Sequence, residues 1–369
     1  MQLQPLPVKR TKRRWRSILL YLLAFIALSY AVLERLPWFK ALSPTPTPTP
    51  TAEDHRRTAL RAYQNGNISA ALEAYEKALA LEPSHVDSLA RMALLLTLRE
   101  KHDEAIATAR RAVSLAPEDS RALAAMAQAL DWDGQLDLAL DYARRAVDAD
   151  SRDGHAHAIL AEVHIDRGEF ALAMNAAERA LSLAPEDAMA HRNMGYVLER
   201  QGLYTRALAE YEEAARLEPN LFLYYLNMGY TYLAMQRPAD AIERFLIACE
   251  KDPNSAWALD ALGWAYLAAG DTATATETLQ KAVEVDPEHT RAHAHLGSAL
   301  YIYLNYEKAI PVLRRAIELG ARDAATYYQL GLCLAYTEQC DEAIPLLQHA
   351  LSLNPEAEPA RRGLAYCGQ

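Results

Sequence analysis

The sequence lacks the local motifs from which common catalytic centres are built. It contains no glycine-rich phosphate loop, no nucleophile elbow and no paired-cysteine zinc motif. It also has no stretch outside its internal repeats that is long enough to fold as a separate enzyme domain. We therefore expect a protein that is not an enzyme and that holds neither a metal ion nor a cofactor.

Positive charge is scarce outside the N-terminal segment. Residues 1–43 hold eight Lys/Arg and one Glu, whereas the rest of the chain holds thirty Lys/Arg against forty-seven Asp/Glu. An acidic surface repels phosphate backbones. The composition therefore argues against nucleic acid as a ligand.

The N-terminal segment combines a basic stretch with an apolar run. Residues 17–33 carry no charge, and Trp15 and Trp38 flank this run as interfacial aromatics do. We expect residues 1–16 to be a cytoplasmic basic segment and residues 17–36 a single-pass transmembrane signal-anchor helix, which places the repeats outside the cytoplasm, in a periplasm or at the cell surface. A cleaved secretory peptide is the alternative, because Ser29-Tyr30-Ala31 loosely resembles a cleavage site. The basic residues are Lys9, Arg10, Lys12, Arg13, Arg14 and Arg16.

Residues 37–51 form a linker in which proline alternates with threonine from Pro44 to Thr51. Proline at every second position fixes φ and removes N–H donors, so neither a helix nor a sheet can form. The pattern predicts an extended polyproline II spacer. Its threonines are either part of a bare spacer or sites of O-glycosylation.

From Ala71 onward alanine recurs every thirty-four residues, and a second alanine series follows seven residues behind it. Two series that stay in register over some three hundred residues indicate one unit copied nine times and stacked. We number the positions of each copy from 1 to 34, so that copy one begins at Ala52. The nine copies cover residues 52–357, and residues 358–369 resemble a tenth first helix that caps the array. The two series are Ala71, Ala105, Ala139, Ala173, Ala207, Ala241, Ala275, Ala309 and Ala343, and Ala78, Ala112, Ala146, Ala180, Ala214, Ala248, Ala282, Ala316 and Ala350.

Each copy has helical apolar spacing that breaks twice, at an internal turn and at a closing proline such as Pro219. Copies five to nine place Met-Gly or Leu-Gly at positions 7 and 8, as in Met194-Gly195. Tyr75, Tyr211 and Phe245 occupy position 24. These residues resemble the tetratricopeptide repeat, a 34-residue helix-turn-helix. The resemblance implies an all-α, right-handed solenoid of about nine repeats that binds a peptide or protein on its concave face.

The resemblance further implies that first-helix positions 2, 5, 6, 9, 12 and 13 line the concave groove. Aromatic residues fill position 9 of copies five to seven, asparagines fill position 6 of copies five and six, and charged residues flank them. Asparagine can bond both groups of a peptide backbone, and rings cover side chains. We expect a membrane-anchored scaffold for a protein partner, with a glycan- or cell-wall-binding factor as the alternative; the oligomeric state is left open. The candidate groove residues are Arg192, Asn193, Tyr196, Asn227, Tyr230, Asp260 and Trp264.

The histidines could bind a metal ion and the cysteines could form a disulfide. Position 4 carries a histidine in four copies, which favours repeated structural rings over metal ligands. The cluster of His155, His157 and His164 in copy four has no two members three or four residues apart, as helical ligands require. Cys340 lies where it could form a disulfide with either Cys367 or Cys333 in an oxidising compartment. The alternative is that these cysteines are small buried hydrophobic residues, as we expect of Cys249. The four histidines are His55, His157, His191 and His293.

Overall fold

A computed structural model describes residues 12–33 and 49–368. The chain divides into two compact units, Met1–Pro50 and Thr51–Gln369, which are described separately. The first unit contains helix α1 (Lys12–Leu33), whose apolar side chains, Leu20 and Phe25 among them, are exposed. In residues 12–33 and 49–368, no helix has both the length and the apolarity that crossing a membrane requires. The transmembrane anchor predicted for residues 17–36 is therefore not supported, and residues 1–11 and 34–48 lie outside the described part.

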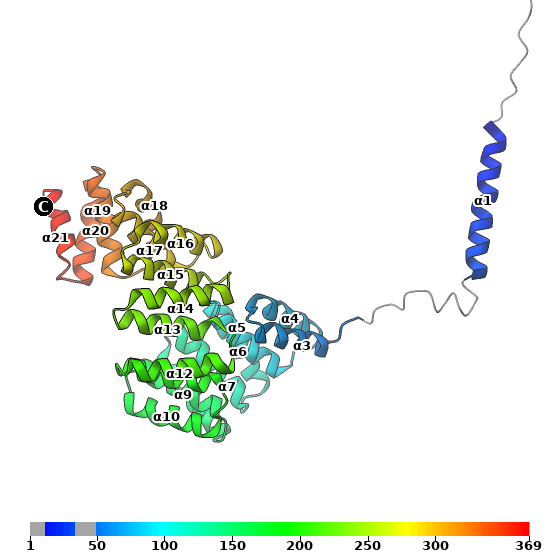
Figure 1. The fold of residues 1–369 in the computed structure, drawn as a ribbon, viewed down its shortest axis with the longest axis horizontal. Helices are drawn as coiled ribbons and strands as arrows, with labels where there is room; N and C mark the ends of the chain where they lie inside the picture. The colour runs from blue at the N-terminus through cyan, green and yellow to red at the C-terminus, as the bar shows by residue number, and fades with distance from the viewer. Residues whose placement is uncertain (1–11, 34–48, 369) are drawn as a thin grey trace, which may run out of the picture. The chain divides into compact units, whose positions relative to one another are not determined.

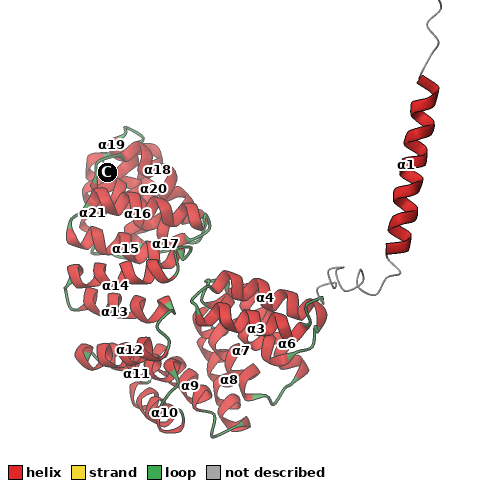
Figure 2. Ribbon diagram, turned by 45° about the vertical axis from the view of Figure 1, so that its right-hand side comes forward, coloured by secondary structure: helices red, strands yellow, loops and turns green. Residues whose placement is uncertain are grey.

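The second unit consists of helices joined by turns and loops, and the residues described there contain no strand (Figures 1 and 2). Every first helix begins at position 1 of its copy and every second helix at position 17. This regularity confirms the predicted all-α solenoid of helix-turn-helix repeats. The first helices are α3 (Ala52–Gln64), α5 (Val86–Thr97), α7 (Ser120–Trp132), α9 (Gly154–Asp166), α11 (Ala188–Arg200), α13 (Phe222–Ala234), α15 (Ala256–Ala269), α17 (Thr290–Ile302), α19 (Ala324–Tyr336) and α21 (Glu358–Tyr366). The second helices are α4 (Ile68–Leu81), α6 (His102–Leu115), α8 (Leu136–Ala149), α10 (Phe170–Leu183), α12 (Tyr204–Leu217), α14 (Pro238–Lys251), α16 (Thr272–Val285), α18 (Tyr306–Glu318) and α20 (Cys340–Leu353).

Most first helices begin where they do because the side chain at position 34 of the preceding copy caps them; α13 and α21, which follow Leu221 and Ala357, have no side-chain cap. The side chains of Asp119, Ser255 and Asp323 each accept a hydrogen bond from the backbone N–H three residues ahead. Such a cap satisfies one of the unpaired donors of the first turn and contributes about 1 kcal/mol. The copied sequence therefore sets the start of most repeats locally.

The two alanine series lie at positions 20 and 27, on the second helix of each copy, and are buried against neighbouring helices. Each of the eighteen alanines is at most 1% exposed. A methyl group is the largest side chain that lets two helices approach at such a contact. The spacing of the series therefore determines how tightly the copies stack.

Positions 8 and 24 of one copy face each other and are matched in size. In copies five to nine position 8 is glycine, and a Cβ built on Gly195 would lie 2.7 Å from the Tyr211 ring. In copies two to four position 8 is alanine and position 24 is also alanine, as in Ala127 and Ala143. Copy one is the exception, with Ala59 beside Tyr75. The large residues that face glycine are Tyr211, Phe245, Leu279, Leu313 and Leu347.

The turn inside each copy requires a left-handed residue at position 15. Five copies supply glycine there, such as Gly202, which adopts this conformation without strain. Four copies hold another residue in the same conformation, at a cost that L side chains rarely bear. These four residues are Glu100 (φ 57°), Gln236 (φ 60°), Leu304 (φ 59°) and Glu338 (φ 64°).

The solenoid curves until its first copies meet its middle copies. The side chain of Asn220 donates to the carbonyl oxygen of Gln64 at 2.9 Å, although 156 residues separate them. One repeat further, Arg99 pairs with Asp252 at 2.6 Å, and both side chains are largely buried. We call this set of contacts, between the internal turns of copies one and two and the loops that precede copies six to eight, the closing contact.

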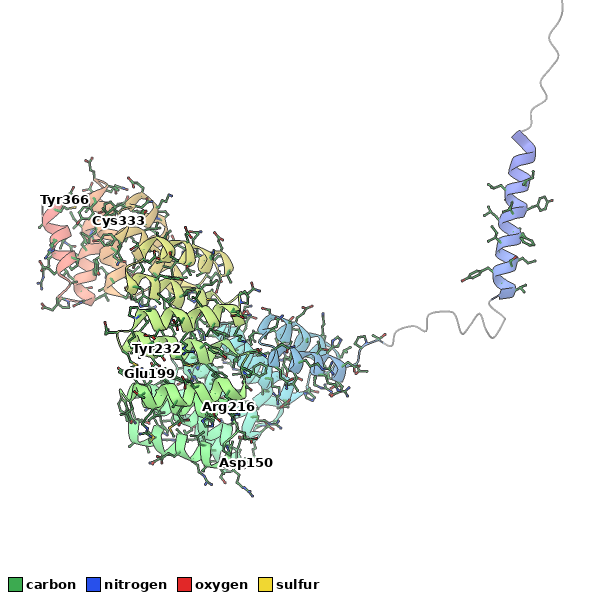
Figure 3. The ribbon with its side chains drawn as sticks, in the orientation of Figure 1. Asp150, Glu199, Arg216, Tyr232, Cys333 and Tyr366 are labelled. Carbon is green, nitrogen blue, oxygen red and sulfur yellow. A yellow bond between two sulfur atoms is a disulfide. The ribbon has the colours of Figure 1, made fainter. Side chains whose placement is uncertain are left out.

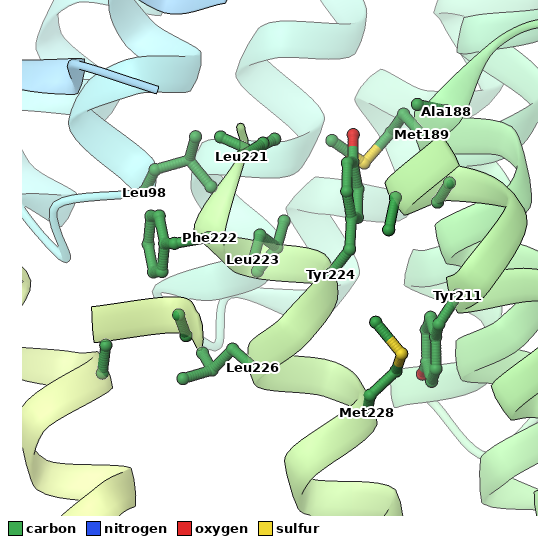
Figure 4. Close-up of a cluster of buried hydrophobic side chains, with 14 of the residues drawn as sticks. Leu98, Ala188, Met189, Tyr211, Leu221, Phe222, Leu223, Tyr224, Leu226 and Met228 are labelled. Atoms are coloured by element: carbon green, nitrogen blue, oxygen red, sulfur yellow. The ribbon is translucent and has the colours of Figure 1, made fainter. Parts of the chain in front are cut away.

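Apolar packing accompanies the closing contact. Leu98, at the turn of copy two, lies beside Leu221 and Phe222 at the start of copy six (Figure 4). The Trp132 ring meets the Trp257 ring edge-on at 5.5 Å between centroids. The inner side of the curve is therefore filled with side chains over part of its length.

Candidate functional site

The predicted groove residues of copy five lie in a buried polar network. Arg192 is 4% exposed and forms an ion pair with Glu162, which is 2% exposed. Arg192 also donates to Asn193 at 2.8 Å and to Asn227 at 3.3 Å. Asn193, fully buried, donates to the carbonyl oxygen of Ala158. The amides expected to bond a peptide therefore bond the protein itself.

The two predicted tyrosines of position 9 are half-buried, and their hydroxyl groups are engaged. The Tyr196 hydroxyl donates to Asp166. The Tyr230 hydroxyl accepts from Trp257 Nε1 at 3.0 Å and from Arg291 at 3.2 Å. Burial raises the pKa of Tyr230 to about 12. These two rings therefore do not form an open aromatic ladder.

Only the last of the predicted groove residues faces solvent. Trp264 is 41% exposed and stacks on His295, with 4.4 Å between ring centroids. Asp260 beneath them is 1% exposed and contacts His295 at 2.6 Å and Arg291 at 2.8 Å. Burial alone would raise the pKa of Asp260, but the hydrogen bond with His295 and the charge of Arg291 hold it below its ordinary value. That the seven predicted residues bind a peptide stays a prediction.

An accessible site lies instead in the earlier copies. A cavity of about 250 Å³, which we call the inner pocket, is lined mainly by the first helices of copies two to five, with Tyr63 and Tyr75 of copy one and with Glu218 and Tyr224. Its lining comes largely from positions 2, 5, 6 and 9, the positions that the resemblance assigned to the groove. The apolar and aromatic part of the lining is Tyr63, Tyr75, Ala90, Leu94, Leu95, Ala125, Met189 and Tyr224.

Charged side chains surround this apolar floor, and most of them are paired. Asp87 accepts from Arg91 and from Arg121, both at 2.9 Å. Because each arginine uses one of its five N–H donors there, donors remain for a ligand. His155 faces Asp187 across the pocket at 3.6 Å. Burial alone would lower the pKa of His155, but its contact with Asp187 outweighs burial and raises that pKa.

One further polar side chain lines the inner pocket, and its amide nitrogen makes no hydrogen bond within the described part of the chain. Gln128, at position 9 of copy three, is 2% exposed and lines the pocket. Among residues 12–33 and 49–368, no acceptor lies within hydrogen-bond distance of its Nε2 atom. A buried amide without an acceptor costs roughly 1 to 3 kcal/mol. Gln128 therefore contributes to the pocket wall a buried amide whose Nε2 donor is unused.

A pair of acids lies next to the polar network of copy five. Asp131 is 4% exposed, and neither carboxylate oxygen has a donor in the described part of the chain. Burial, together with the charges of Glu162 and Asp166, raises the pKa of Asp131 from 3.8 to about 9. Burial likewise raises the pKa of Asp166. Asp131 therefore stays protonated at neutral pH.

The histidines of position 4 have a repeated structural contact. In His157, His191 and His293 the Nε2 atom lies 3.0 to 3.1 Å from the backbone carbonyl oxygen six residues earlier. Each ring thereby ties the start of its helix to the preceding loop. No group of three His, Cys, Asp or Glu side chains in the residues described could hold a metal ion.

The cysteines divide into one bonded pair and two free thiols. Cys340 and Cys367 form a disulfide, one of the two pairings that the sequence left open. Cys333 is free and buried, and Cys249 is free and half-buried. Burial raises the pKa of each free thiol to about 12, so both are unreactive thiols at neutral pH.

The sequence matches two family models, both described as tetratricopeptide repeat. The first covers residues 56–120, 160–221 and 261–325, and the second covers residues 324–356. Together they span more than half of the chain. No curated protein matches the sequence significantly.

Several solved structures share the fold. The APC/C hetero-tetramer Cut9-Hcn1 contains a chain with a TM-score of 0.65 and 17% identity, over 87% of this chain and 67% of that one. Yeast Tom70 gives a TM-score of 0.53 and 14% identity over 93% of this chain and 92% of that one. Pseudomonas aeruginosa pilF gives a TM-score of 0.52 and 20% identity over 58% of this chain and 99% of that one. Identities this low establish the architecture alone.

Proposed function

The chain belongs to the tetratricopeptide repeat family, and from that premise we propose that it is an interaction scaffold that holds an extended segment of a partner protein in the inner pocket. The Cut9-Hcn1 structure, which shares this fold, is a hetero-tetramer, so a chain with this fold associates with other chains there. A non-enzymatic role is part of the proposal, since the lining contains no nucleophile beside a base.

The unpartnered amide of Gln128 is the observation that carries this proposal. A peptide backbone in an extended conformation presents carbonyl oxygens that such an amide can bond. The floor around Leu94 and Ala125 can take an apolar side chain, and about 250 Å³ is the size of one or two side chains. Arg91 and Arg121 keep free donors at the rim. An extended peptide with a large apolar side chain fits this combination.

The test replaces Gln128 by leucine, which keeps the volume and removes the donor. The probe is a random dodecapeptide library displayed on phage and selected on the full-length parent protein. Loss of one hydrogen bond should weaken the selected peptides roughly 3- to 10-fold, since a net hydrogen bond is worth about 0.5 to 1.5 kcal/mol. Thermal stability should stay equal or rise, because a buried unpaired group is removed.

The matched control is Gln329→Leu in copy nine. Gln329 is also buried, but its Oε1 accepts from Ser298 at 2.7 Å. This change should lower stability and leave peptide binding unaltered. Peptides that bind the Gln128→Leu protein as tightly as the parent would place the binding site outside the inner pocket.

We further propose that the array lies on the extracytoplasmic side of a membrane and is tethered by its N-terminal segment. The support is the charge asymmetry around residues 17–33 and the disulfide between Cys340 and Cys367, which suits an oxidising compartment. Protease added to intact spheroplasts should digest the repeats, and alkaline carbonate should fail to extract the chain. Protection from protease, or release by carbonate, would contradict the topology or the tether respectively.

A further inference from the structure

The C-terminal end of the array carries a row of tyrosines whose rings contact one another, from three successive copies. Tyr301 and Tyr306 lie 6.1 Å apart between ring centroids, Tyr306 and Tyr336 lie 5.1 Å apart, and Tyr336 and Tyr366 lie 5.4 Å apart. The rings come from α17, α18, α19 and α21. We call these four residues the tyrosine row; Figure 3 labels Tyr366 at its outer end.

The tyrosine row continues into exposed apolar residues at the turn of copy eight. Tyr336 is 40% exposed and Tyr366 is 60% exposed. Tyr303 and Leu304 in the turn are 63% and 69% exposed. Leu304 is held at φ 59°, where five other copies have glycine. Three other turns also hold a non-glycine residue in this conformation, and Leu304 differs from them in presenting an exposed apolar side chain close in sequence to the tyrosine row.

The row is held rigidly at its outer end. Tyr366 precedes Cys367, and the disulfide ties Cys367 to Cys340 at the start of α20. Helix α21 is the last and shortest helix of the array and would otherwise fray. The covalent bond therefore fixes the position of the Tyr366 ring against Tyr336.

Acidic side chains border the row. An open depression of about 590 Å³ is lined by Tyr336 together with Glu307 and Glu338. In the described part of the chain neither glutamate has an ion-pair partner within 4.0 Å, and none of the four tyrosine hydroxyls has a hydrogen-bond partner. The surface thus offers aromatic rings, hydroxyl donors and unpaired negative charge.

We propose that the tyrosine row is a docking site for a proline-rich, positively charged peptide of a partner protein. Adjacent rings are inclined by 43°, 46° and 86° and contact one another directly, so the outer faces of the exposed rings of Tyr336 and Tyr366 are the surfaces open to a ligand. Their spacing of 5.1 to 6.1 Å is close to the rise of two residues in a polyproline II helix, about 6 Å. Prolyl rings pack on exposed aromatic faces of this kind, and the free hydroxyls can donate to carbonyl oxygens that a polyproline helix leaves unbonded.

The charges and ring angles favour this occupant over two others. A second copy would bring the same unpaired glutamates, Glu307 and Glu338, against themselves, whereas basic residues of a peptide would neutralise them. Inclined rings give no flat platform on which a sugar face could stack. The site is separate from the inner pocket, so the two proposals stand or fall independently.

The experiment measures fluorescence anisotropy of a labelled decaproline peptide that carries two arginines at each end, titrated with the full-length chain. The double variant Tyr336→Ala, Tyr366→Ala should bind at least 10-fold more weakly than the parent. The control Tyr142→Ala, a half-buried tyrosine on α8, should bind as the parent does. Reduction of the disulfide should also weaken binding, and a peptide with glutamates in place of the arginines should bind at least 5-fold more weakly.

Circular dichroism melts of each variant identify any loss of folding, and Leu304→Gly provides a second test. Leu304→Gly relieves the strained backbone, so it should weaken peptide binding while thermal stability rises or stays the same. The proposal is overturned if the parent does not bind the basic peptide, or if the tyrosine variants bind it equally. It is also overturned if a chito-oligosaccharide displaces the peptide at lower concentration, or if sedimentation shows a dimer that the tyrosine variants abolish.

Discussion

The match in size between positions 8 and 24 predicts a specific energetic coupling in copy seven. A Cβ built on Gly263 would lie 2.5 Å from Leu279 Cγ and 2.8 Å from Leu279 Cδ2. Leu279 is fully buried and cannot move aside. Overpacking of this kind costs about 1 to 3 kcal/mol. Alanine in a helix interior recovers roughly 0.5 to 1 kcal/mol relative to glycine, so Gly263→Ala should destabilise the array by about 1 to 2 kcal/mol.

When Leu279 is replaced by alanine, the change Gly263→Ala should stabilise the array instead of destabilising it. Leu279→Ala alone should cost about 2 to 5 kcal/mol through lost burial and a cavity. In the double variant the methyl group of residue 263 has room, as it has between Ala127 and Ala143 in copy three. The change at Gly263 should then stabilise by roughly 0.5 to 1 kcal/mol. The coupling free energy of the cycle is therefore about 2 kcal/mol.

Urea denaturation followed by far-UV circular dichroism measures the cycle. The control pairs Gly263→Ala with Leu347→Ala, which faces Gly331 two copies away; these two changes should add within about 0.5 kcal/mol. If Gly263→Ala and Leu279→Ala also add within that margin, the two positions do not compete for space and the packing argument fails.

Three further predictions concern the closing contact, the buried acid and the disulfide. Arg99→Ala leaves Asp252 buried without its cation, so it should destabilise by about 3 to 5 kcal/mol and enlarge the radius of gyration in small-angle scattering; an unchanged radius would refute the closure. Because the pKa of Asp131 is raised from 3.8 to about 9 by burial and neighbouring acids, the folded state binds the extra proton in that window. Stability should therefore fall as pH rises from 4 to 9, and the fall should be shallower in Asp131→Asn. Reduction of the 27-residue disulfide loop should destabilise the C-terminal copies by roughly 3 to 4 kcal/mol, seen as faster amide exchange in α21, while α3 exchanges as before.

The repeats were predictable because their signal is local and copied. The alanine series, the glycine at position 15 and the cap at position 34 each act within one copy or between neighbours. These features account for helix starts at positions 1 and 17 in most copies, although four copies have another residue at position 15 and α13 and α21 have no side-chain cap. Asp119 and Gly202 show this, since their roles depend only on residues a few positions away.

The placement of the candidate groove could not be predicted in the same way. It depends on how far the solenoid curves, and curvature sums small rotations over many copies. Asn193 and Asp260 occupy groove positions of their own copies, yet both are buried among neighbouring side chains. Gln128 occupies position 9 as Tyr196 does, but only the structure shows that its amide lacks an acceptor. The closing contact joins Gln64 to Asn220, and no spacing in the sequence indicates that pair.

The proposed function requires that a peptide partner enters the inner pocket and does not bind to the later copies. Photo-crosslinking tests this directly, with benzoyl-phenylalanine placed either at Leu94, which lines the pocket, or at Trp264, the exposed ring of copy seven. With the phage-selected peptide as probe, we expect a covalent adduct from position 94 and none from position 264. An adduct from position 264 alone would contradict the account.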